Sequence, residues 1–260
     1  MRKILSAVAL AFMTTILSVA QQNLPHKADI DALLVKLRSN DGGVRDQAYE
    51  QLKSDPTALR SAKVRAALLD LLDRENRELD SQLVEAQKKG YPDEGDNAGW
   101  AEYYSDLLGT VDSFADWNDP RQARVLVDAG SSDDSAFATE IADHAKVTIP
   151  CLMKRSASTI SMNRAVAVPV LVQALAKAKD SLDPRTAQAA RQIVLGALSD
   201  PDEGVRAFTV HALGRFGAED MIAALRKVAQ TDPSPEVEGH SIRKSAAEAI
   251  TAIQKRASPH

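Results

Sequence analysis

The strongest constraint on the fold is a helix–turn–helix pattern in Ile193–Phe216, which reads IVLGALSDPDEGVRAFTVHALGRF. The turn is Ser199–Gly204, where Pro201 cannot continue a helix and disfavours helical geometry at the residue before it. Asp202 can cap the helix that follows, and Glu203 complements the positive end of that helix. The segment therefore predicts two helices joined by a tight turn.

The second helix of this unit has a single apolar stripe at helical period. The stripe follows the spacing i, i+3, i+7, i+8 and i+11, with the members Val205, Phe208, Ala212, Leu213 and Phe216. Val210 lies off this stripe, and the small Ala207 and Ala212 allow neighbouring helices to approach closely. We expect a helix of this kind to be contacted from two sides, by its own partner and by the next unit.

The same pattern recurs elsewhere in the chain. Residues 30–52 repeat it, with Val44-Arg45 aligned on Val205-Arg206. A looser copy over residues 223–253 contains the turn Asp232-Pro233, and Ile242-Arg243 restores the apolar–arginine pair after a short insertion. Successive turns are separated by about 30 residues, which is typical of short helical repeats.

These residues resemble HEAT repeats, specifically the short bacterial kind named after phycobilisome-lyase proteins. The resemblance covers residues 30–72 and 190–253, whereas residues 80–160 fit by helicity alone. It implies an all-α fold, an α-solenoid of antiparallel helix pairs that is irregular in the middle and binds other molecules. In such repeats the arginine after the valine often bonds to a neighbouring repeat. The resemblance therefore assigns a ladder to Arg45, Arg206 and Arg243, with Asp200 or a neighbouring turn aspartate as the acceptor.

Four segments are predicted from these patterns. Residues 1–20 are a signal peptide, 24–85 are N-terminal HEAT-like helices, 86–163 are an irregular helical middle with an acidic loop, and 164–256 are C-terminal HEAT repeats. In the middle, one helix is expected to stop at Gly90-Tyr91-Pro92 and another to close near Pro150. No strand pattern stands out.

The first twenty residues have the features of a secretory signal. Arg2-Lys3 precedes the apolar run Ile4–Val19, and Ser18-Val19-Ala20 is a small-x-small cleavage site. An N-terminal membrane anchor is the alternative, but the run is short for a spanning helix, which needs about 20 apolar residues. We expect an exported protein, periplasmic or secreted, that is free of the membrane after cleavage.

The charge and the reactive residues favour binding over catalysis. A net charge of −4, from 32 basic and 36 acidic residues, gives no electrostatic footprint for nucleic acid. No two of the five histidines have the i, i+3 or i+4 spacing of a helical zinc pair. Cys151, the one cysteine, is either a small buried hydrophobe or a thiol activated at a helix N-terminus. We therefore expect no catalytic residue, no metal and no cofactor.

Five aromatic residues of the irregular middle are the candidate partner-binding residues: Tyr91, Trp100, Tyr103, Tyr104 and Trp117. Aromatic residues are enriched in binding hot spots. The alternative is that Trp100 and Tyr104 fill the core between irregular repeats. Two function classes follow. The first is a non-enzymatic exported scaffold that binds a protein or peptide on its groove, and the alternative is a lyase-like enzyme on a HEAT platform.

The signal sequence predicts that the mature chain begins at Gln21, because the small residues before it form the cleavage site. Intact-mass measurement of the exported protein checks this expectation. A chain that retains Met1 and stays tightly bound to membranes would contradict it.

Overall fold

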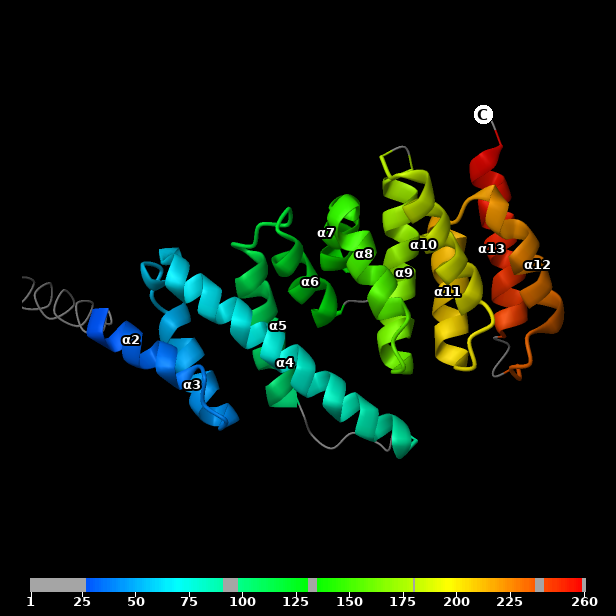
Figure 1. The fold of residues 1–260 in the computed structure, drawn as a ribbon. Helices are drawn as coiled ribbons and strands as arrows, with labels where there is room; N and C mark the ends of the chain where they lie inside the picture. Colours follow the sequence, from blue (N-terminus) through cyan, green and yellow to red (C-terminus); the bar gives the residue numbers. More distant parts are fainter. Residues whose placement is uncertain (1–26, 91–97, 131–134, 180, 237–240, 259–260) are drawn as a thin grey trace, which may run out of the picture. The chain divides into compact units, whose positions relative to one another are not determined.

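The structure, a computed structural model, describes residues 27–90, 98–130, 135–179, 181–236 and 241–258. Within these ranges the chain is all-α and contains no strand (Figure 1). The α-helices are α2 (Lys27–Lys36), α3 (Gly42–Lys53), α4 (Ala62–Lys88), α5 (Ala98–Asp112), α6 (Pro120–Ala129), α7 (Ala136–Asp143), α8 (Ala145–Ser156), α9 (Ser161–Lys177), α10 (Pro184–Ala197), α11 (Glu203–Phe216), α12 (Ile222–Thr231) and α13 (Ile242–Ala257). Two short 3-10 helices are η1 (Ala58–Arg60) and η2 (Glu219–Met221).

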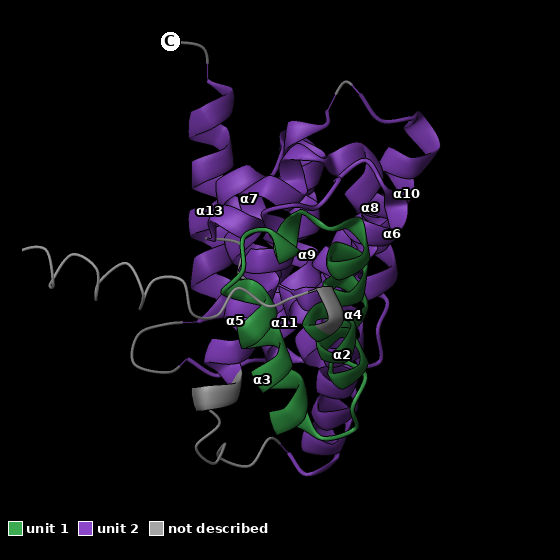
Figure 2. Cartoon of the chain, turned by 90° about the vertical axis from the view of Figure 1, so that its left-hand side faces the viewer, with its two compact units in different colours: residues 1–71 green, residues 72–260 purple. Residues whose placement is uncertain are grey.

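The chain forms two compact units, shown in different colours in Figure 2. The division falls between Leu71 and Leu72, inside α4, whereas the sequence pattern suggested a boundary after residue 85. A continuous helix can cross such a division because its own backbone hydrogen bonds do not depend on tertiary packing. None of the described helices is long and apolar enough to cross a bilayer.

Unit 1 contains the helical pair α2 and α3, which pack against each other. Its core includes Leu33, Leu37, Tyr49 and Leu52, all nearly inaccessible to solvent. The side chain of Asp41 caps α3 by accepting hydrogen bonds from the first free N–H groups of that helix.

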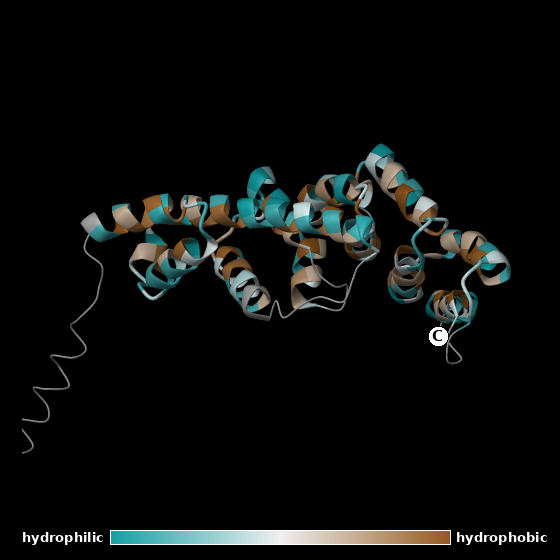
Figure 3. Ribbon diagram, turned by 90° about the horizontal axis from the view of Figure 1, so that it is seen from below, coloured by the Kyte–Doolittle hydropathy of each residue, from teal (hydrophilic) through white to brown (hydrophobic). Residues whose placement is uncertain are grey.

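Unit 2 is an α-solenoid built from antiparallel helix pairs. α9 contacts α7, α8, α10 and α11, while α11 lies between α9 and α13 (Figure 1). Many of these helices have hydrophobic and hydrophilic residues on different sides (Figure 3), as packing along one face requires. The two-sided covering of α11 is therefore as the sequence predicts, because successive repeats pack on its opposite flanks.

The buried face of α11 differs from the predicted stripe. Val205, Ala212 and Leu213 are buried as expected, but Phe208 is 52% exposed and Val210 is fully buried. Phe208 and Val210 are two residues apart and therefore lie on different sides of α11, of which the side of Val210 is buried and the side of Phe208 is open to solvent. The burial of Val210, which lies off the stripe, agrees with the expected contact from two sides. The prediction was wrong for Phe208, because the stripe in the sequence does not say on which side the next helix packs.

The corner between α7 and α8 also differs from the expectation. Pro150 lies inside α8, and the break occurs at His144 instead. At this corner Thr148 Oγ1 lies 2.8 Å from the carbonyl oxygen of Ile141, to which it donates a hydrogen bond. This bond satisfies a carbonyl near the end of α7 and ties α8 to it. The helix therefore ends before the proline rather than at it.

α11 and α13 approach each other through glycine. A Cβ atom added to Gly214 would lie 3.3 Å from Cβ of Ala249. A Cβ atom added to Gly217 would lie 2.5 Å from the carbonyl oxygen of Leu213 and 3.2 Å from Cδ1 of Ile253. Since the nearest atom at Gly217 belongs to the backbone, it cannot move aside cheaply.

We predict that Gly217→Ala lowers the free energy of unfolding by about 1–3 kcal/mol, the cost of overpacking a tight contact. The matched control is Gly109→Ala in α5, where an added Cβ meets no atom within 4 Å. That change is expected to raise stability by about 0.5–1 kcal/mol, because alanine is the better helix former. Denaturant unfolding of both variants measures the difference. Equal effects of the two substitutions would contradict the tight fit at Gly217.

Candidate functional site

Arg206 joins two consecutive turns of unit 2. Its side chain is 7% exposed and lies near the start of α11. Its Nε donates to Oδ2 of Asp232 at 2.8 Å, and its Nη2 donates to Oγ of Ser234 at 2.6 Å. Its Nη1 donates to the carbonyl oxygen of Asp200 at 2.8 Å. The guanidinium therefore bonds both to the turn before its own helix and to the turn of the following repeat.

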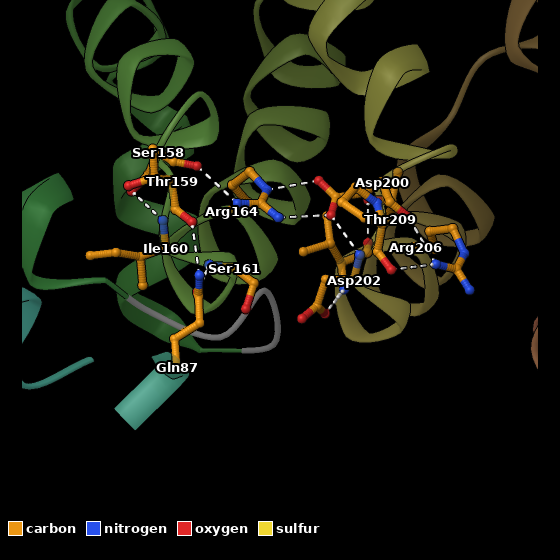
Figure 4. Close-up of polar contacts among 12 residues, drawn as sticks. Gln87, Ser158, Thr159, Ile160, Ser161, Arg164, Asp200, Asp202, Arg206 and Thr209 are labelled. Atoms are coloured by element: carbon orange, nitrogen blue, oxygen red, sulfur yellow. Dashed lines mark hydrogen bonds and ion pairs between the residues drawn. The ribbon is translucent and has the colours of Figure 1, made fainter. Parts of the chain in front are cut away.

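Arg164 makes the equivalent link one repeat earlier. Its Nε and Nη2 bind the two carboxylate oxygens of Asp200 at 2.7 and 2.8 Å, while Nη1 donates to the carbonyl oxygen of Ser158 (Figure 4). The carboxylate of Asp200 thus accepts hydrogen bonds from Arg164, whereas Arg206 donates to the main-chain oxygen of that residue. Sequence reasoning missed Arg164 because Asn163 stands where the valine of the repeat is expected.

The other two predicted ladder residues, Arg45 and Arg243, differ from each other in their contacts. Arg45 is 4% exposed and donates from Nη1 to the carbonyl oxygens of Ser39 and Asn40, 3.2 Å away in each case. Arg45, Arg164 and Arg206 therefore share a hydrogen bond to the carbonyl six residues before them. Arg243 is exposed on α13 and makes no hydrogen bond or ion pair within the described ranges, which corrects its assignment to the ladder.

The ladder keeps its aspartates ionised. Burial opposes ionisation of Asp200 and Asp232, but hydrogen bonds from Arg164 and Arg206 outweigh it and hold both pKa values below the usual range. Backbone N–H groups two residues on add to the effect, from Asp202 to Asp200 and from Ser234 to Asp232. The two ion pairs are thus charged at neutral pH and largely shielded from water.

The aromatic candidates of the middle mostly lie in the interior. Trp117 is 5% exposed and stacks on His144, with ring centroids 5.3 Å apart and planes at 8°. The buried hydroxyl of Tyr104 lies 2.5 Å from Oδ1 of Asn76, and burial raises its pKa. Both rings fill the core, which corrects their assignment to a partner surface. The alternative of core filling is thus the one that holds for Tyr104.

Of the remaining three aromatic candidates, the structure describes the side chain of Tyr103 alone. Tyr103 is half-buried on α5. Tyr91 and the side chain of Trp100 lie outside the described residues. The candidates whose side chains the structure describes, Tyr103, Tyr104 and Trp117, are therefore not gathered on an exposed surface.

A polar cluster in the irregular middle escaped the sequence analysis. Arg124 of α6 binds Asp73 of α4 and Asp128 of its own helix, at 2.9 Å in both cases. Arg155 of α8, itself buried, donates to Oδ1 of Asn163 of α9 at 2.9 Å. Arg124 and Asp128 have a helical i, i+4 spacing, but Asp73 lies 51 residues from Arg124, so local spacing does not reveal the contact between α4 and α6. The cluster takes the place of the regular ladder where the repeats are irregular.

The one cysteine is not an activated thiol. Cys151 is half-buried inside α8, and burial, with Asp128 nearby, raises its pKa. A helix N-terminus or an adjacent cation would have the opposite effect. Across the described part of the chain, no three histidine, cysteine or acidic side chains are placed to hold a metal ion.

The exposed face of α11 carries an aromatic and two basic side chains. Phe208, His211 and Arg215 follow the spacing i, i+3 and i+7, and all three are exposed. We call them the α11 ridge. Because residues at this spacing share one side of a helix, they present a single surface between α9 and α13.

Comparison with known proteins supports the repeat architecture of unit 2. Residues 170–251 match the family described as HEAT repeats. The matched range runs from the second half of α9 into α13 and includes the turns of Asp200 and Asp232. No curated protein matches the chain.

We predict that Arg206→Ala lowers the free energy of unfolding by about 3–5 kcal/mol, because it leaves the carboxylate of Asp232 buried and unpaired. Arg215→Ala, on the exposed side of the same helix, is expected to cost less than about 1 kcal/mol. Denaturant unfolding at neutral pH compares them. Equal midpoints of the two variants would contradict a structural role for the ladder.

Arg206→Ala also tests how the stability of the folded protein depends on pH. An aspartate with a lowered folded-state pKa adds stability above its unfolded pKa, and this stability is lost as the pH falls through the folded-state pKa. The difference in the free energy of unfolding between Arg206→Ala and the unmodified protein should therefore become smaller below about pH 4, the ordinary pKa of aspartate. If the difference in the free energy of unfolding stayed constant with pH, the stability lost in Arg206→Ala would come from packing alone.

Proposed function

We propose that this protein is an exported, non-enzymatic scaffold that binds a protein or peptide on the exposed face of its C-terminal repeats. The observation that carries the proposal is the α11 ridge, on which the aromatic ring of Phe208 is half-exposed in the middle of a packed helix. HEAT repeats commonly serve as surfaces for protein interaction, and the ridge lies inside the segment that matches them.

The composition of the ridge supports protein binding. Aromatic residues and arginine are enriched among the residues that contribute most to interface affinity. The ring of Phe208 can bury apolar area, while His211 and Arg215 can contact polar or acidic groups on either side of it. The stacked repeats around α11 fix these side chains on a rigid element, which lowers the entropy lost on binding.

The chemistry of the reactive groups supports a scaffold rather than an enzyme. The pKa of Cys151 is raised, so its thiol is mostly protonated at neutral pH. Trp117 covers one face of the His144 ring. Neither group has the setting of an activated nucleophile or an open general base. Export rests on the first twenty residues, which have the charge and apolar pattern of a secretory signal.

A photo-crosslinking amino acid placed at position 208 tests the scaffold in cells that export the protein. We expect one discrete crosslinked partner from position 208 and none from the matched control position 226 on α12, where Arg226 is also exposed. With the purified partner, Phe208→Ala should weaken binding about tenfold or more, because truncation of a hot-spot aromatic typically costs over about 1 kcal/mol. Equal crosslinking from both positions, or unchanged affinity, would contradict the ridge as the binding surface.

A further inference from the structure

Unit 2 contains an apolar hollow on the side of α10 and η2. Its cavity measures about 70 Å³, and its apolar wall includes Val172, Val194, Leu213, Phe216 and Met221. We call it the α10–η2 hollow. One water needs about 10–15 Å³, so the space is several times larger and suits a small aliphatic group. Protein interiors rarely leave an apolar space of this size unfilled.

Small residues and a fixed turn explain why the hollow exists. Ala176 and Ala218 line it and are exposed, so at these two positions the hollow is bordered by methyl groups alone. The turn after α11 borders the hollow through Gly217 and Ala218, and it is fixed by the hydrogen bond that Gly217 N donates to the carbonyl oxygen of Leu213 at 2.8 Å.

The rim of the hollow is charged and has an excess of positive charge. Lys179, Arg191 and Asp220 line it together with the apolar wall. Nε of Arg191 lies 3.7 Å from Oδ2 of Asp220, and both side chains are about half-exposed. Lys179 is exposed and has no ion pair within the described ranges. Counted over the described residues, Lys179 is thus the rim cation that can meet a negative group beside the hollow.

We propose that the α10–η2 hollow takes an aliphatic side chain of a partner peptide whose next residue is acidic, with the carboxylate at Lys179. The inference rests on the proposed function as a protein- or peptide-binding scaffold and names the chemistry of the bound segment. The apolar wall supplies affinity by burying the side chain. The rim supplies selectivity, because a basic residue in place of the acidic one would face Lys179 and Arg191.

The probe for the test is the blocked dipeptide N-acetyl-Leu-Glu-amide, titrated into the full mature protein with labelled methyl groups. We expect saturable shifts of the methyl signals of Val194, Leu213 and Met221. N-acetyl-Leu-Lys-amide should bind about three- to tenfold more weakly, because an attractive exposed pair is replaced by a repulsive one. Lys179→Glu should reverse this preference.

Two further variants complete the test. Lys255→Glu on α13 is the matched charge reversal away from the hollow and should leave both titrations unchanged. Ala218→Phe should abolish the shifts by placing a ring in the hollow, and the exposed position of Ala218 lets the fold remain, as a thermal melt verifies. An absence of shifts with the unmodified protein, or shifts that ignore both Lys179→Glu and Ala218→Phe, would overturn the inference. Shifts centred on Phe208 would also overturn it, yet would leave the proposed scaffold function standing.

Discussion

The buried guanidinium of Arg206 is the interaction on which the C-terminal repeats depend. An arginine removed from water is tolerated only when its donors find acceptors, because the cost of desolvation otherwise exceeds the Coulombic gain. Here the acceptors are a carbonyl of the preceding turn and the side chains of Asp232 and Ser234 in the next turn. Satisfying this one side chain therefore fixes the distance and orientation between two turns. Nearest-neighbour contacts of this kind carry the stability of repeat proteins.

The ladder also explains where the architecture is regular and where it is not. Arg164 and Arg206 repeat the same contact in successive units, each reaching the aspartate of the next Asp-Pro turn. In the irregular middle, Arg124 and Arg155 instead join helices through a cluster with Asp73 and Asp128. In both arrangements a buried arginine of unit 2, Arg206 or Arg155, lies within ion-pair distance of a carboxylate. They differ in that the ladder can be extended by another repeat, whereas the cluster is particular to its place.

Both candidate binding features depend on the packing of α11. The α11 ridge is exposed because α9 and α13 cover the flanks of the helix and leave one side open. The α10–η2 hollow is lined in part by Leu213 and Phe216 of the same helix and by Gly217, which follows it. A peptide-binding scaffold needs an exposed surface that is held on a rigid element, since a fixed surface loses little entropy on binding.

The sequence by itself determined the helices, the turns and the kind of repeat. Its Asp-Pro turns, the cap at Asp202 and the apolar period of α11 are local features, and local features are set by backbone geometry within a few residues. It also singled out Arg206, because the repeat places that arginine beside a buried valine.

Only the tertiary structure decided which side of each helix is exposed and which charges are paired. Phe208 and Val210 both suit an apolar helix, and only the packing of the neighbouring helices decided that Val210 is buried and Phe208 faces solvent. Arg164 and Arg243 are equally polar in sequence, yet among the residues that the structure describes only the first is paired with an aspartate. Trp117 lies in the core because His144 and Phe137 come to it from another helical pair. Burial and ion pairing depend on residues distant in the chain, and helical period carries no information about those neighbours.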